Sequence, residues 1–89
     1  MAGIIVVKAN ETQRQKAATP VFHDWECEVS EFDHVYNEPE TFLVLEGRAE
    51  IQYAGGTASF GAGDWVLISK IGKSHWKVSE KIKKRYRFG

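Results

Sequence analysis

From Val21 to the end of the chain, short runs alternate between apolar and polar residues. In residues 25–29 the apolar side chains alternate with two glutamates, as in a β-strand with one buried face. Phe32, His34 and Tyr36 have the opposite parity. Because a shift of one residue moves every side chain of a strand to the other face, a turn or bulge has to fall near residues 29–31. The pattern therefore predicts two strands on either side of that point.

Further strand-like runs follow at close spacing. They are TFLVLE (41–46), RAEIQYA (48–54), TASF (57–60), WVLIS (65–69), HWKV (75–78) and IKKRYRF (82–88). Gly55-Gly56 is a two-residue hairpin signal, and Gly47 is expected at positive φ where its strand ends. Only residues 11–17, with Asn10 as cap, suggest a helix. About eight strands in series predict an all-β antiparallel sandwich or small barrel with at most one short helix.

The chain of 89 residues is expected to form one domain, residues 1–89. Cys27 is the only cysteine and cannot pair internally, which suggests a reducing compartment. The apolar start GIIVV is too short for a signal peptide or a membrane span. We therefore expect a soluble, cytoplasmic protein with no membrane partner.

Formal net charge is zero, but the charges are unevenly placed. Residues 24–50 hold nine of the twelve acids, and residues 70–87 hold eight of the twelve bases. The basic stretch could serve phosphates, or it could lie beside the acidic one and form cross-strand pairs. We expect the pairs, with Lys84 and Arg85 facing acids of residues 25–33, and no nucleic-acid partner.

Two spacings carry the chemistry. The first is His34-x-Tyr36-x3-Glu40-x6-Gly47, and the second runs from Gly63-Asp64 through an apolar strand to Gly72-x2-His75. Residues i and i+2 of a strand share a face, so His34 and Tyr36 are predicted to point inward together.

These spacings resemble the two sequence motifs of the cupin superfamily, whose members are small jelly-roll β-barrels. A closer resemblance, over residues 25–86, is to the family named after the ureidoglycine aminohydrolase cupin domain. It is carried by WEC (25–27), LEG (45–47), GD (63–64) and WKV (76–78), with Phe32, Glu40, Glu80, Lys84 and Tyr86. Tyr36 stands where cupins commonly have a second histidine, and Ser69 replaces a proline of the second motif.

The resemblance implies that His34, Glu40 and His75 converge on one metal inside the barrel. Two imidazoles and a carboxylate suit Fe, Mn, Ni or Zn, so one such divalent metal is the expected cofactor. Tyr36, Glu40 and Lys77 are predicted to line the binding pocket, and no catalytic residue is assigned.

Each of these residues also has a structural interpretation. His34 and His75 could be partly exposed strand histidines, and Tyr36 could belong to the core. Glu40 could form a salt bridge to a basic strand, because a buried carboxylate needs a partner. His23 is expected at the surface, and Cys27 as a small buried residue rather than a nucleophile.

Three functions remain open at this point. The first is a cupin that binds a small molecule in its barrel cavity. The second is a metal-dependent enzyme of the aminohydrolase, dioxygenase or isomerase type. The third is a non-catalytic module that interacts through an exposed sheet edge. The chain is expected to be a monomer or a homodimer.

Overall fold

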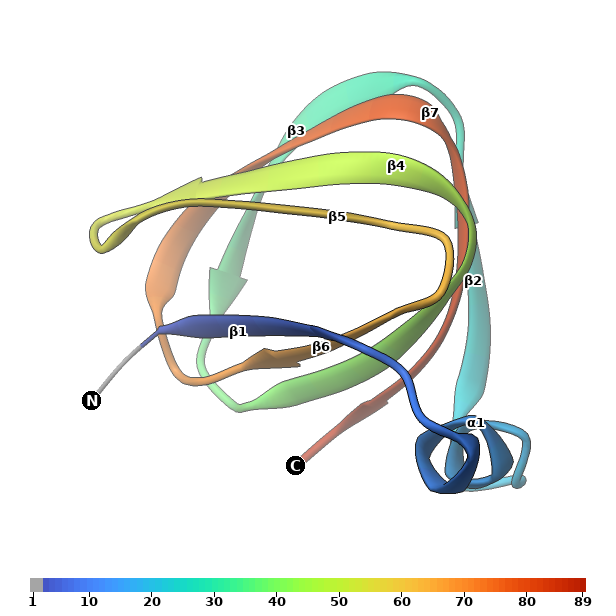
Figure 1. The fold of residues 1–89 in the computed structure, drawn as a ribbon. Helices are drawn as coiled ribbons and strands as arrows, with labels where there is room; N and C mark the ends of the chain where they lie inside the picture. Colours follow the sequence, from blue (N-terminus) through green and yellow to red (C-terminus); the bar gives the residue numbers. More distant parts are fainter. Residues whose placement is uncertain (1–2) are drawn as a thin grey trace.

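A computed structural model describes residues 3–89 of the protein, which form seven strands and one helix (Figure 1). In chain order these are β1 (Ile4–Lys8), α1 (Glu11–Ala17), β2 (His23–Cys27), β3 (Ser30–Tyr36), β4 (Glu40–Tyr53), β5 (Gly56–Gly61), β6 (Asp64–Ile68) and β7 (Gly72–Phe88). The predicted phase change falls in the turn between β2 and β3. No helix in this part of the chain has the length and apolar character needed to cross a membrane.

All strand pairings are antiparallel and belong to one curled sheet. One side of it has the order β1-β6-β4-β7-β2, while β5 pairs with the second half of β4 and β3 with the first half of β7. Figure 1 shows that β4 and β7 bend so that each contributes to both layers. The predicted all-β, jelly-roll class with one short helix is confirmed. Among residues 3–89, however, the pairing does not close a barrel, because β1 pairs only with β6 and β5 only with β4.

The sequence prediction divided β4 and β7 into two strands each, and both are continuous. Gly47 lies where β4 bends, at φ +88°, and the pairing with β7 shifts register on either side of it. A Cβ on Gly47 would lie 2.1 Å from the carbonyl oxygen of Lys81. Only glycine therefore lets β4 pass β7 this closely at the bend, and the expected positive φ of Gly47 is confirmed.

Helix α1 has the predicted bounds and cap. Asn10 Oδ1 accepts a hydrogen bond from the backbone N–H of Gln13 at 2.8 Å, and Gln13 Oε1 accepts one from the N–H of Asn10 at 2.9 Å. This reciprocal pair is a capping box. The helix end packs on the outer face of the sheet, where a second buried cluster forms from Ala9, Ala17, Phe22, Leu43 and Trp65.

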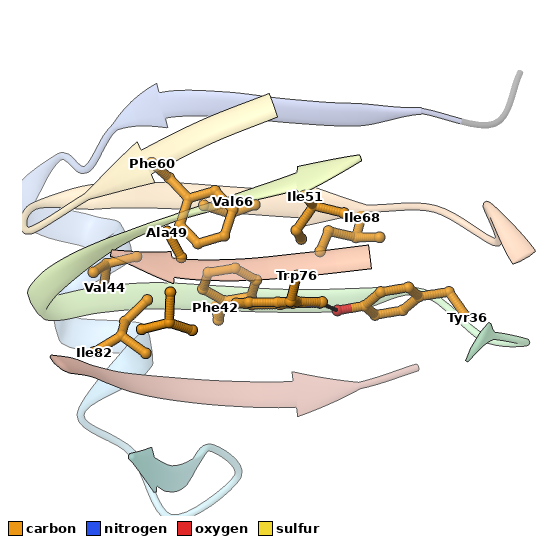
Figure 2. Packing of buried hydrophobic residues seen from close by; sticks show 11 residues of the cluster. Tyr36, Phe42, Val44, Ala49, Ile51, Phe60, Val66, Ile68, Trp76 and Ile82 are labelled. Carbon is orange, nitrogen blue, oxygen red and sulfur yellow. Dashed lines mark hydrogen bonds between the residues drawn. The ribbon is translucent and has the colours of Figure 1, made fainter. Parts of the chain in front are cut away.

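The main core lies between the two layers (Figure 2). Its buried members are Tyr36, Phe42, Val44, Ala49, Ile51, Phe60, Val66, Ile68, Trp76, Val78 and Ile82. Figure 2 shows Tyr36 at one end of this core, joined to Trp76 by a hydrogen bond. Cys27 is half-buried against the same cluster. The core thus fills most of the interior and stops at the Tyr36 end.

Acidic and basic strands lie side by side, as the charge pattern predicts. Lys81 pairs with Glu26 and Glu28, and Lys83 pairs with Glu46, at 3.3 to 3.6 Å across neighbouring strands. These exposed pairs are each worth little energy, but together they favour the observed register.

Candidate functional site

A cavity of about 140 Å³ lies beyond the Tyr36 end of the core. Strands β2, β3, β4 and β7 supply its lining, which consists of Trp25, Phe32, His34, Tyr36, Glu40, Trp76, Lys84, Tyr86 and Phe88. Tyr36, Glu40, Trp76 and Lys84 are buried and form the floor, whereas His34, Tyr86 and Phe88 are more exposed and form the rim. The cavity is therefore an aromatic pocket with a charged floor.

Strand alternation explains how β3 reaches the cavity. Phe32, His34 and Tyr36 point inward, and the alternating residues Glu31, Asp33 and Val35 are exposed. The loop at residues 37–39 then reverses the chain. Glu40, the first residue of β4, enters between β6 and β7, where it pairs with Ile68 and Phe88. His34, Tyr36 and Glu40 thus line one cavity.

Both oxygens of the Glu40 carboxylate are occupied. The Tyr36 hydroxyl donates to Oε1 at 2.9 Å, and the Lys84 ammonium donates to Oε2 at 2.8 Å. Trp76 Nε1 in turn donates to the Tyr36 hydroxyl oxygen at 3.2 Å. Glu40 therefore forms a salt bridge to a basic strand, as its structural interpretation predicted. The bridge lies inside the cavity.

The Lys84 ammonium lies among aromatic rings as well as beside Glu40. Its Nζ is 4.1 Å from the ring centre of Phe42, 4.6 Å from that of Trp25 and 4.7 Å from that of Trp76. Such contacts stabilise a cation electrostatically, and more so where water is excluded. Lys84 is 5% exposed and Glu40 3%. The floor therefore holds a desolvated ion pair in an aromatic cage.

Burial changes the acidity of two of these groups. It raises the pKa of the Tyr36 hydroxyl far above its ordinary value, and the charge of Glu40 adds to the effect. The phenol thus stays protonated and remains a hydrogen-bond donor. Burial also lowers the pKa of Lys84, against the opposing pull of Glu40. Desolvation accounts for both directions, since it disfavours the charged form of each group.

The prediction that His75 joins this cavity is wrong. In β7 the side chains of Ser74, Trp76 and Val78 are buried, so His75 lies on the outer face. Its Nδ1 is 2.7 Å from Asp33 Oδ1 and its Nε2 is 2.9 Å from Glu31 Oε1, both across the β3–β7 ladder. These hydrogen bonds raise the pKa of His75, with Glu31 the larger contributor.

Two lysines of β7, Lys77 and Lys84, lie on the opposite sides of the sheet from those predicted. Lys77 shares the outward parity of His75 and does not line the cavity, so its assignment to the pocket is wrong. Lys84 was expected to face acids of residues 25–33, yet its partner is Glu40 inside the cavity. Arg85 pairs with Asp24, one residue before the expected range. The signal for Lys84 was present, because it lies two residues from both Ile82 and Tyr86 in the inward phase of β7.

The predicted metal does not fit these residues. His75 is on the outer face, and both oxygens of Glu40 already accept hydrogen bonds, one of them from the Lys84 ammonium. Within residues 3–89 no group of three His, Cys, Asp or Glu side chains is placed to hold a metal ion. Of the three predicted ligands, His34 and Glu40 line the cavity, and within residues 3–89 His34 is its one histidine. The position beside Glu40 that a metal would need is filled by the Lys84 ammonium.

The arrangement favours recognition of an oxygen acceptor. An ammonium group has three N–H donors, and among residues 3–89 Lys84 gives one of them, to Glu40. The Tyr36 hydroxyl is committed to Glu40 and Trp76. A molecule in the cavity can therefore accept a hydrogen bond from Lys84 while its apolar part contacts the aromatic wall.

Comparison with known proteins gives a family. Residues 6–86 match the family described as EutQ-like cupin domain. A search of curated proteins found no significant match.

Solved structures give the same result. A DUF861 family protein from Thermotoga maritima is 31% identical with a TM-score of 0.87, and the alignment covers 98% of this chain and 100% of that one. The EutQ protein of Clostridium difficile is 25% identical with a TM-score of 0.64, over 71% of this chain and 50% of that one. A putative ethanolamine utilization protein Q from Salmonella typhimurium, 18% identical with a TM-score of 0.67 over 96% of this chain and 68% of that one, shares the fold. The more specific resemblance to ureidoglycine aminohydrolase cupin domains stays a prediction.

Proposed function

The chain belongs to the EutQ-like cupin domain family, and from that premise we propose that it binds a small, uncharged organic molecule in the cavity above Glu40 and Lys84. The observation that carries the proposal is the buried ion pair on the floor of an otherwise aromatic pocket. A buried pair is often no more stabilising than apolar residues of the same volume. Stability alone is therefore a weak reason for it, whereas recognition of a polar ligand needs such groups.

The size of the cavity limits the ligand. An apolar cavity of about 150 Å³ accommodates benzene, so this one suits a molecule of roughly six non-hydrogen atoms. The rings of Trp25, Phe32 and Trp76 form flat walls against which a ring or a short branched chain can pack. The expected ligand is compact and largely apolar.

The charge of the floor limits the ligand further. Glu40 and Lys84 neutralise each other, so an added anion would be repelled by the carboxylate and an added cation by the ammonium. A neutral molecule with one strong acceptor oxygen avoids both costs. It also uses a free N–H of Lys84 without separating the ammonium from Glu40.

A thermal-shift series with δ-valerolactam tests the proposal. This six-membered ring carries one carbonyl acceptor and no charge. Ligand that binds only the folded state raises the melting temperature in proportion to the logarithm of its concentration above Kd. We expect such a rise with the lactam, a smaller rise with cyclohexane, which lacks the oxygen, and the smallest with butyrate, which carries a charge. Quenching of tryptophan fluorescence should follow the same order, since Trp25 and Trp76 line the cavity.

Two variants provide the comparison, one a control on the surface of β7 and the other a change at the cavity floor. Lys83→Met removes an exposed lysine paired with Glu46 and should leave the lactam response unchanged. The double variant Glu40→Gln/Lys84→Met keeps the floor neutral but removes the ammonium donor. It should lose most of the rise in melting temperature that the lactam produces. A lactam response equal in the wild type and the double variant would contradict binding at this floor.

A metal-dependent aminohydrolase reaction, suggested by the sequence resemblance, has less support because the donor set does not fit a metal. An interaction module is the second candidate, favoured by one observation. Strand β1 is the end strand of its side of the sheet, and the exposed side chains of Ile5 and Val7 lie beside Leu67 of β6. Unpaired edges of this kind are sites of strand addition. If β1 forms a homodimer edge, Ile5→Lys should convert a dimer in sedimentation analysis into a monomer.

A further inference from the structure

Among residues 3–89, Lys84 is the one lysine in the cavity wall, which suggests a chemical role for its amine beyond hydrogen bonding. We propose that Lys84 forms an imine with a small aldehyde or ketone that enters this cavity. This inference rests on the proposed binding function and names the class of molecule bound. It has three geometric supports: a buried amine, a carboxylate in contact with it, and an adjoining space of the right size.

The carboxylate of Glu40 can hold the proton that Lys84 has to lose. At 2.8 Å from Nζ, Oε2 lies within direct proton-transfer distance. Transfer converts the ion pair to a neutral amine and a neutral carboxylic acid, and a desolvated site disfavours that neutral pair less than water does. Burial lowers the pKa of Lys84 in the same sense. An amine desolvated in an apolar pocket is a recognised form of activated nucleophile.

The step balances without any further reactant. The amine lone pair of Lys84 attacks the carbonyl carbon, a C–N bond forms, and the carbonyl π electrons move to oxygen. A proton passes from nitrogen to that oxygen, which gives a neutral carbinolamine. Glu40 then returns its proton to the hydroxyl, the C–O bond breaks, and water leaves as the nitrogen lone pair completes the C=N bond. The product is a protonated imine beside an ionised Glu40.

The site suits this product, because the protonated imine carries the same charge in the same place as the original ammonium. The rings of Trp25, Phe42 and Trp76 that surround Nζ would stabilise it as they stabilise the ammonium. Tyr36, whose hydroxyl is bonded to Oε1, keeps the carboxylate oriented with Oε2 toward Nζ. Tyr36 is therefore a positioning residue.

Lys81 and Lys83 provide an internal comparison on the same strand. Both are paired with carboxylates, at 3.3 to 3.6 Å, but their side chains are 38–49% exposed and they border no part of the cavity. Burial, aromatic contact and the adjoining cavity thus distinguish Lys84 from lysines that share its charge pairing.

Reductive alkylation of the wild-type protein tests the inference. The folded protein is incubated with cyclopentanone, a ring of roughly the predicted size, and sodium cyanoborohydride, which reduces a protonated imine to a stable secondary amine. Tandem mass spectrometry of chymotryptic peptides then follows each lysine over time. We expect Lys84 to be alkylated at least several-fold faster than Lys81 and Lys83. In urea-unfolded protein the three rates should become equal.

The alkylation rates support or overturn imine formation at Lys84 as follows. Faster alkylation of Lys84, lost in Glu40→Gln but kept in a Glu46→Gln control, supports the inference. Alkylation of Lys84 no faster than that of Lys81 and Lys83 overturns it. If δ-valerolactam still raises the melting temperature in that case, the binding function stands and only the imine fails. If the lactam has no effect either, both fail.

Discussion

The Nζ atom of Lys84 lies 2.8 Å from Oε2 of Glu40, and both side chains are buried although the two residues are 44 positions apart in the chain. Both charges are largely removed from water, so each depends on the other for stabilisation. Lys84→Met should lower the free energy of unfolding by about 3–5 kcal/mol, because it leaves a carboxylate buried without a counter-charge. Urea denaturation at pH 7 measures this change.

The double variant Glu40→Gln/Lys84→Met separates loss of the pair from loss of packing. It should recover most of the stability lost by Lys84→Met, since no buried charge remains. Lys83→Met, which removes an exposed pair with Glu46, should change stability by less than about 1 kcal/mol. Equal losses for the three variants would mean that Lys84 is solvated in solution.

Gly47 and Gly63 have the same backbone conformation but differ in the space around the Cβ position, so their alanine variants can be compared. Both have positive φ, +88° and +91°, but a Cβ on Gly63 meets nothing within 4 Å, whereas one on Gly47 would lie 2.1 Å from Lys81 O. Gly63→Ala should cost roughly 1–2 kcal/mol, from backbone conformation alone. Gly47→Ala should cost about 3 kcal/mol or more, because β4 and β7 must also separate. Similar midpoints in urea for the two variants would argue against close passage of the strands.

The hydroxyl of Tyr36 connects Trp76 to Glu40. Tyr36→Phe leaves Trp76 Nε1 without its acceptor and Glu40 Oε1 without its donor, so it should cost about 1–3 kcal/mol of stability. Tyr53→Phe, at the half-buried end of β4, is the control and should cost much less. Equal costs for the two variants would show that water replaces the hydroxyl in the cavity.

The pKa of His75 should be above the usual value of about 6.5, because Glu31 and Asp33 bond its ring. A raised folded-state pKa means that the folded protein binds the proton more tightly than the unfolded chain. The resulting stabilisation is complete below the unfolded pKa of about 6.5 and is lost as pH rises through the folded value. NMR titration of the ring protons should show a lower pKa in Glu31→Gln/Asp33→Asn. An identical pKa in that variant would mean that the outer cluster does not form in solution.

Much of this fold could be predicted because period-two alternation decides which face of a strand is buried. The alternation around Phe32, His34 and Tyr36 placed three side chains correctly relative to one another, and the Asn10 cap located the helix. The same rule, applied to β7, would have excluded His75, since Trp76 beside it is inward. The motif spacing favoured His75 instead, and a motif carries no information on strand phase.

Lys84 could not be assigned in the same way. A lysine in a basic run is nearly always solvated, so the inward phase between Ile82 and Tyr86 was outweighed by its charge. Its burial depends on Glu40, which is brought beside it only when β4 and β7 pair. Such long-range pairing follows from tertiary structure rather than from local pattern. The continuity of β4 and β7 was missed for the same reason, because each bends against the other.

A crystal structure of the protein soaked with δ-valerolactam tests most directly whether this cavity is the binding site. We expect the lactam ring in the cavity, packed against its aromatic lining, with its carbonyl oxygen within hydrogen-bond distance of Lys84 Nζ and the Glu40–Lys84 contact intact. Lactam bound elsewhere, or a cavity without lactam in crystals of protein that binds it in solution, would contradict the assignment of this cavity as the binding site.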